Sequence, residues 1–219
     1  MERGKSSNVD RIHGAGWAGM IGPALFVVVV TVEGWFRPDY NPVTQFISEL
    51  SLGSRGWVQI INFIVLGMLL LLFAYGVAAE FKNGKASKSG PIILGVIGIL
   101  VFLSGPFVMD PANLPFEQMS WHGILHQLFG AFAFLLMPIS CLVFWRRFRS
   151  DPNWRLLQHW TLLAGIVTMG AVVLLRVGVT PPAPPSLLNQ WIGLIQRIAL
   201  VTFLVWIFTF ALHLLRIRR

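Results

Sequence analysis

Six runs of about 20 predominantly apolar residues cover most of the chain, and they restrict its fold more than any other feature. A transmembrane helix needs about 20 such residues, because each adds about 1.5 Å and the hydrocarbon core is about 30 Å thick. Charged residues make up only 12% of the 219 residues, against about 25% in soluble domains. The sequence predicts an all-α polytopic membrane protein, a single domain over residues 1–219. Its six predicted spans are 16–36, 57–79, 91–109, 121–145, 156–179 and 188–215.

Lysine and arginine are concentrated in alternate connecting segments. Of the 17 basic residues, 13 lie in the two terminal tails and the second and fourth loops, whereas the odd-numbered loops hold only Arg37 and Arg55. Because basic residues favour the cytoplasmic side, we expect both termini inside and a location in the plasma membrane. Tryptophans near the span ends predict an aromatic belt at each interface: Trp17, Trp145, Trp154 and Trp160 inside, Trp35, Trp57, Trp121 and Trp191 outside.

Several functional classes receive no support from the sequence. The net charge of +8 is divided into short clusters between apolar runs, whereas binding to nucleic acid needs a continuous basic face. The single cysteine, Cys141, lies inside an apolar run and predicts neither a disulfide nor a thiolate metal site. The sequence contains no nucleophile elbow, phosphate loop or dinucleotide fingerprint. The expected partners are membrane lipids.

Most ionisable residues in or next to the predicted spans lie in the outer half of the bilayer, and the inner half has only His159 and His213, near its basic cytoplasmic edge. Such groups are costly in a membrane and usually face a partner or a wet cavity. Their one-sided placement predicts a polar pocket that opens outward and binds a lipid headgroup or a small amphiphile. Alternatively, Glu33 or Asp110 pairs with Arg176 or Arg197 only to lock the helices together. The residues in this outer half are Glu33, Asp110, His122, His126, Arg176 and Arg197.

A histidine pair at the start of the fourth span is a candidate metal site. His122 and His126 are four residues apart, so both imidazoles project from one helix face. Two such histidines with Asp110 would form a two-His, one-carboxylate site with an open position, typical of zinc. The alternative is that the two histidines pack and form hydrogen bonds at a helix end.

The segment "NPVTQFISELSLGSRGW", residues 41–57, predicts a short amphipathic helix in the outer interface. Asn41 and Pro42 are typical of a helix start, and Gly53 of a stop. Such a helix would present Ser48 and Glu49 over the mouth of the pocket, or would only pack there. Its apolar stripe consists of Val43, Phe46, Ile47 and Leu50.

Four stretches give the chain a resemblance to a family of six-helix membrane proteins from bacteria and archaea, known as domain of unknown function nine-nine-eight. They are "FISELSLGSRGWVQIINFIVLGMLLLLFAYGV", "GPFVMDPAN", "WHGILHQLFG" and "LIQRI", with the Asp at the end of the third span. The family is distantly similar to DRAM/Sfk-like proteins, some of which are tied to lipid remodelling. A fainter likeness to alkaline ceramidases and adiponectin-type receptors implies zinc chemistry, but the chain has two outer histidines and six helices where that superfamily has three and seven.

Three functions remain open from the sequence. The first is the binding or transport of a lipid headgroup or amphiphile in the outward pocket, with Arg176 and Arg197 receiving its anionic group. The second is a membrane-embedded metal hydrolase, with zinc on His122, His126 and Asp110 and with Glu49 as general base. The third is a non-catalytic scaffold in which the same residues fix helix packing.

Overall fold

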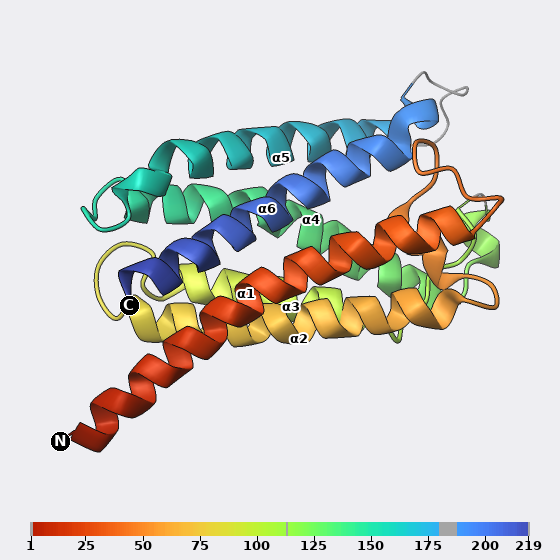
Figure 1. Ribbon diagram of the computed structural model, residues 1–219. Coiled ribbons are helices and arrows are strands. Elements are labelled where there is room, and N and C mark those ends of the chain that lie inside the picture. The colour runs from red at the N-terminus through yellow and green to blue at the C-terminus, as the bar shows by residue number, and fades with distance from the viewer. Residues whose placement is uncertain (1, 113, 180–187, 219) are drawn as a thin grey trace.

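The computed structural model describes residues 2–112, 114–179 and 188–218, with side chains from residue 11 onward. Its regular elements in these ranges are all helical, and the predicted all-α, six-helix fold is confirmed. Each helix packs on its neighbours in sequence and α1 packs on α6, which closes the six into a ring (Figure 1). The helices are α1 (Glu2–Phe36), α2 (Gly56–Glu80), α3 (Ser89–Leu103), α4 (Trp121–Phe148), α5 (Gln158–Val179) and α6 (Ile192–Ile217).

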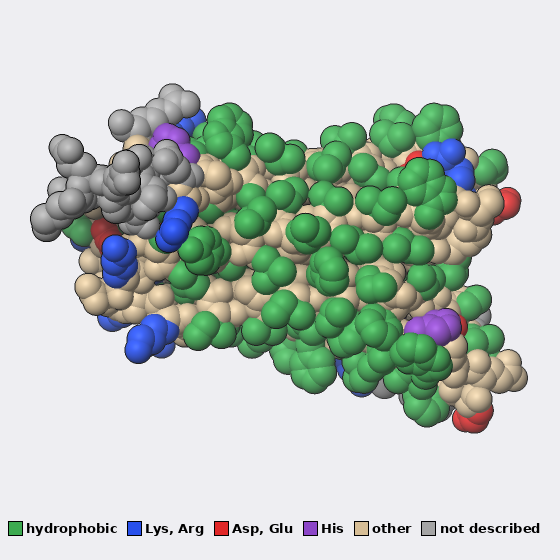
Figure 2. Space-filling view, turned by 90° about the horizontal axis from the view of Figure 1, so that it is seen from below, with side chains coloured by type: hydrophobic (Ala, Val, Ile, Leu, Met, Phe, Trp, Pro, Cys, Tyr) green, Lys and Arg blue, Asp and Glu red, His purple; other side chains and the backbone are tan. Residues whose placement is uncertain are grey.

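The two chain termini lie at the same end of the bundle, which we call the terminal end (Figure 1). The opposite end, here the distal end, carries the α1–α2 and α3–α4 connections. Hydrophobic side chains cover the middle of the molecule and charged ones gather at its two ends (Figure 2). In the described part of the chain, five helices are long and apolar enough to cross a membrane, and α3 is a shorter apolar helix. The chain is therefore a multi-pass membrane protein, whereas its orientation stays a prediction.

The third predicted span, 91–109, is wrong at its distal end. Helix α3 stops at Leu103, and its 15 residues rise only about 22 Å, less than the hydrocarbon thickness. Pro106 accounts for the stop, because it has no N–H and its ring clashes with the preceding helical turn. The chain continues without helix to Asp110, and Ser104, Gly105 and Met109 are buried in the protein.

The predicted interfacial helix is a single 3₁₀ turn, Ile47–Ser51, in the α1–α2 connection. Asn41 caps a turn rather than a helix, since its Oδ1 accepts the N–H of Val43 at 2.9 Å. Ile47 and Leu50 are buried against the bundle, so the stripe packs on protein. Gly53 has φ +79°, which agrees with its predicted role as a stop.

An aromatic core fills the terminal end. Trp154 was expected at the membrane interface, but it is only 1% exposed, so this part of the predicted belt is wrong. Its ring stacks on Phe148 with centroids 5.1 Å apart and meets Phe81 edge-on at 4.9 Å. Phe210 of α6 contacts both Trp154 and Phe148. The α4–α5 connection is thereby anchored inside the ring. The tryptophans Trp17, Trp35, Trp57, Trp121 and Trp191 are exposed, as a belt requires.

Candidate functional site

The distal end holds the residues that the sequence singled out, and they fall into separate clusters. In the first, Glu33 near the end of α1 is nearly buried and binds Arg55 of the α1–α2 connection. Arg55 donates from Nη2 at 2.5 Å and from Nε at 3.0 Å, a bidentate geometry. The hydrogen bond to Glu33 raises the pKa of Arg55. The predicted pairing of Glu33 with an arginine of a later span is wrong, because the partner comes from the loop.

Arg197 of α6 forms the second cluster by holding the α1–α2 connection. Its Nη1 donates to the carbonyl oxygens of Pro42 at 2.6 Å and Gln45 at 3.0 Å. Its Nη2 donates to the hydroxyl of Tyr40, and the guanidinium lies 5.5 Å from the centre of that ring. These acceptors are neutral, so they orient the guanidinium without cancelling its charge.

Neighbouring residues of α6 bind the same connection. Gln196 Oε1 accepts the N–H of Ile47 at 2.7 Å, and Leu194 N–H donates to Val43 O at 3.0 Å. Gly193 is required for this approach, because a Cβ there would lie 2.2 Å from the Gln45 carbonyl oxygen. Two adjacent polar residues and a glycine of α6 thus fix the loop in place.

Tyr40 links the guanidinium to the 3₁₀ turn. Its hydroxyl donates to Phe46 O at 3.0 Å while it accepts from Arg197. Burial raises the pKa of Tyr40, and the positive charge of Arg197 opposes that shift. The phenol therefore stays protonated and can donate at neutral pH.

The side chain of Glu49 is bound within the α1–α2 connection itself. Its carboxylate accepts the backbone N–H of Phe46 at 2.8 Å and the side-chain amide of Gln45 at 3.2 Å. Its carbonyl accepts from Arg37 Nη1 at 2.6 Å. Ser48 is buried, and its carbonyl accepts from Ser51 Oγ at 2.6 Å. Glu49 thus stabilises its own turn, and this geometry gives no support to a lid that presents it to a pocket.

The third cluster joins the end of the α3 segment to the start of α4. Asp110 accepts the N–H of Ser120 at 2.7 Å and its hydroxyl at 2.8 Å. Ser120 Oγ caps α4 by accepting the N–H of Gly123 at 3.1 Å, and it lies 2.8 Å from His122 Nδ1. Because the one hydroxyl proton goes to Asp110, His122 must donate to Ser120. The serine oxygen is then fully used as a cap, so the geometry favours a structural role over that of a nucleophile.

His126 satisfies the backbone that the early end of α3 leaves unpaired. Its Nδ1 lies 2.7 Å from Phe107 O and 3.1 Å from Ser104 O, and it donates to these carbonyls. Non-helical backbone at membrane depth needs such partners. Within the described residues, no three His, Cys, Asp or Glu side chains are grouped as a metal site needs. The two histidines and Asp110 instead bind Ser120 and carbonyl oxygens.

A narrow groove runs between α1 and α6 below the Arg197 cluster. Its volume is about 60 Å³, and apart from Arg197 and Thr31 its walls are apolar. Arg197 is the wall residue of α6 nearest the distal end. Arg176, the other predicted cation, lies exposed in the last turn of α5. The groove is lined by Phe26, Val27, Val30, Thr31, Ile47, Arg197, Leu200, Val201 and Leu204.

The sequence reasoning missed several residues that hold the distal end together. Ser120 carried a usable signal, since a serine directly before an apolar helical run is a typical N-cap. Gln196 was also visible as a polar residue inside a span. No sequence pattern marks Tyr40 or the need for glycine at 193, because their contacts join segments far apart in the chain. The need for glycine at 123 depends on how closely Asp110, in the preceding connection, approaches α4.

Comparisons with known proteins give one result. No curated protein and no solved structure matches the chain. A family model matches residues 20–213, nearly the whole chain. The expected distant likeness to DRAM/Sfk-like proteins stays a prediction. The chain belongs to the family described as Protein of unknown function (DUF998).

Proposed function

We propose that this membrane protein binds a phospholipid, without catalysis, in the groove between α1 and α6. The observation that carries the proposal is the position of Arg197, a cation at the distal end of a groove whose other walls, apart from Thr31, are apolar. An acyl chain would lie along the walls formed by Val27, Val30 and Leu200, and the phosphate would lie near the guanidinium. An ionisable residue inside a membrane helix is costly, and it usually has a polar partner or faces a wet cavity.

The bonding of Arg197 suits such a role. Its acceptors in the α1–α2 connection fix the planar guanidinium in one orientation. Both terminal nitrogens of the guanidinium already donate to neutral acceptors, so a phosphate would meet its uncancelled positive charge and its remaining N–H groups. The same contacts show why Arg197 is a poor test residue: its removal would also release the loop.

The groove itself allows a cleaner test on α1. Val27 lines the groove, whereas Val28, the next residue, is exposed on the helix surface. We expect Val27→Trp to fill the groove and to lower the amount of phospholipid retained after purification in mild detergent. Val28→Trp adds the same side chain to the lipid-facing surface and should retain as much lipid as the parent. Native mass spectrometry of the intact protein counts the retained lipids.

Two outcomes would decide against the groove. Equal retention by both variants would show that the lipid does not occupy it. An equal loss from both would point to a general effect of the added tryptophan on lipid contact. Thermal unfolding of both variants separates loss of lipid from loss of folding.

A further inference from the structure

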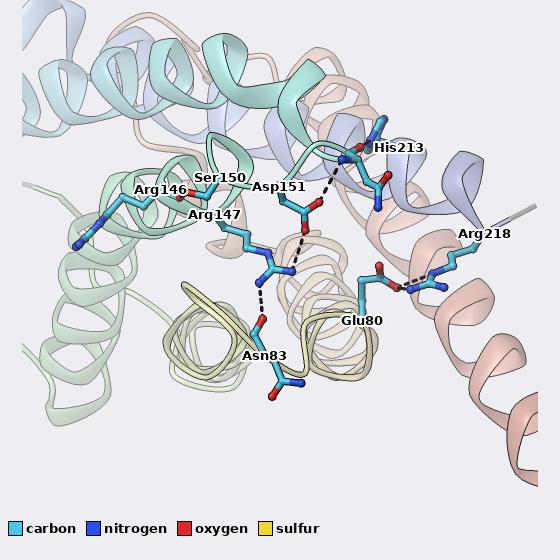
Figure 3. A network of polar contacts seen from close by, with 9 residues as sticks. Glu80, Asn83, Arg146, Arg147, Ser150, Asp151, His213 and Arg218 are labelled. Carbon is cyan, nitrogen blue, oxygen red and sulfur yellow. Dashed lines mark hydrogen bonds and ion pairs between the residues drawn. The ribbon is translucent and has the colours of Figure 1, made fainter.

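At the terminal end, two acidic side chains are already bound by arginines (Figure 3). Asp151 accepts from Arg147 Nη2 at 2.9 Å, and Arg147 also donates to the carbonyl of Asn83. Glu80 binds Arg218 at 2.7 Å. Figure 3 shows Arg146 directed away from both carboxylates. Among the described residues, no ion pair involves Arg146.

Arg146 instead lines a cavity between the start of α3 and the last turns of α4. The cavity has a volume of about 210 Å³ and is lined by Lys85, Ala86, Ser89, Val143 and Arg146. Its walls thus contain two cations and a hydroxyl and no carboxylate. Lys85 is held near α4 by a 3.3 Å hydrogen bond from Nζ to Ser150 Oγ.

Two features of the backbone also distinguish the cavity wall: the start of α3 and the conformation of Ala86. Ser89 is the first residue of α3, so the positive end of that helix dipole lies at the cavity. Ala86 has φ +59°, a conformation that costs free energy for a residue with a Cβ. The α2–α3 connection therefore holds an unfavourable backbone geometry at the point where it forms the cavity wall.

We propose that this cavity binds a phosphate group, that of an acidic phospholipid in the adjacent leaflet. Lys85 and Arg146 would bind the phosphate oxygens, and Ser89 would donate a further hydrogen bond. Val143, on the membrane-crossing helix α4, provides an apolar wall for the glycerol and the first acyl carbons. Basic pockets between membrane helices are typical sites for anionic headgroups. The site is separate from the α1–α6 groove and does not depend on it.

The test measures binding of phosphatidylglycerol to the full chain in a neutral detergent, by native mass spectrometry. Neutral micelles have no charged surface, so a cation that does not touch the lipid contributes little. We expect Arg146→Gln to weaken binding about tenfold, the loss of one charge-assisted hydrogen bond. Arg149→Gln is the matched control, because Arg149 is exposed on the same turn and stacks on Trp145 outside the cavity. This control should bind like the parent.

Lys85→Gln provides a second variant in an exposed connection, where a folding defect is not expected, and it should also weaken binding. If both cavity variants bind phosphatidylglycerol like the parent, or Arg149→Gln weakens it equally, the proposal is overturned. Phosphatidylcholine and inorganic phosphate form the other arms. Selective retention of phosphatidylglycerol supports a lipid source, whereas displacement of that lipid by millimolar phosphate supports the same site with a free anion as ligand.

Discussion

Gly123 shows how a residue without a side chain can join two helices. It lies in the first turn of α4, and a Cβ at this position would be 2.1 Å from Asp110 Oδ2. The carboxylate therefore reaches Ser120 only because position 123 is bare. In the sequence, the histidines of "WHGILHQ" draw attention as metal ligands, yet the glycine between them determines how closely Asp110 can approach α4.

We expect Gly123→Ala to destabilise the protein by about 1–3 kcal/mol, because an added methyl group in a filled space displaces its neighbours. The matched control is Gly130→Ala in the same helix, where nothing lies within 4 Å of the added Cβ. That change should be neutral or stabilising, because alanine favours helix over glycine. Thermal unfolding in detergent compares the two, and equal stability of both variants would contradict the contact with Asp110.

At the scale of elements, the six apolar runs were enough to predict six helices, since length and hydropathy alone determine which segments can cross a membrane. The end of α3 was not predicted, although Pro106 was a visible signal. Apolar residues continue past it to Met109, and hydropathy does not distinguish a helix from irregular backbone buried in protein. The partner that makes this backbone tolerable, His126, comes from another helix, and a sequence does not show such pairings.

His126→Leu tests whether that pairing supports the interruption. The change removes the donor to Ser104 O and Phe107 O and puts an apolar side chain of similar size in its place. We expect a loss of about 1–3 kcal/mol in stability, the cost of leaving a buried polar group unpaired. The adjacent Gln127→Leu, at an exposed position on the same helix, should change stability little. Hydrogen exchange should rise around residues 104–110 only in the first variant; unchanged exchange there would refute the role.

The candidate site shows the same division between what a sequence does and does not reveal. The end of the bundle at which it lies was predictable, because each polar residue could be placed along a helix of known rise. Its pairings were not, because Arg55 and Tyr40 approach Glu33 and Arg197 from the α1–α2 connection. A single outward pocket was therefore expected where the structure has separate clusters that fix loops.

For the whole molecule, the two ends of the ring are built differently. The terminal end is filled by aromatic rings around Trp154 and Phe210, with basic residues at its surface. The distal end is held by polar contacts between loops and helix ends. Both proposed lipid sites lie where a cation meets an apolar wall, one at each end. Opposite leaflets would then be contacted by opposite ends, which makes the orientation of the chain the next question.

Orientation can be tested with single cysteines, because the native Cys141 is buried and should react little. Glu117 and Lys88 are exposed at the distal and terminal ends. From the distribution of basic residues we expect Glu117→Cys to react with a membrane-impermeant maleimide in intact spheroplasts. Lys88→Cys should react only after permeabilisation. The opposite pattern would place the basic end outside and the Lys85–Arg146 site in the outer leaflet, and it would leave the chemistry of that site unchanged.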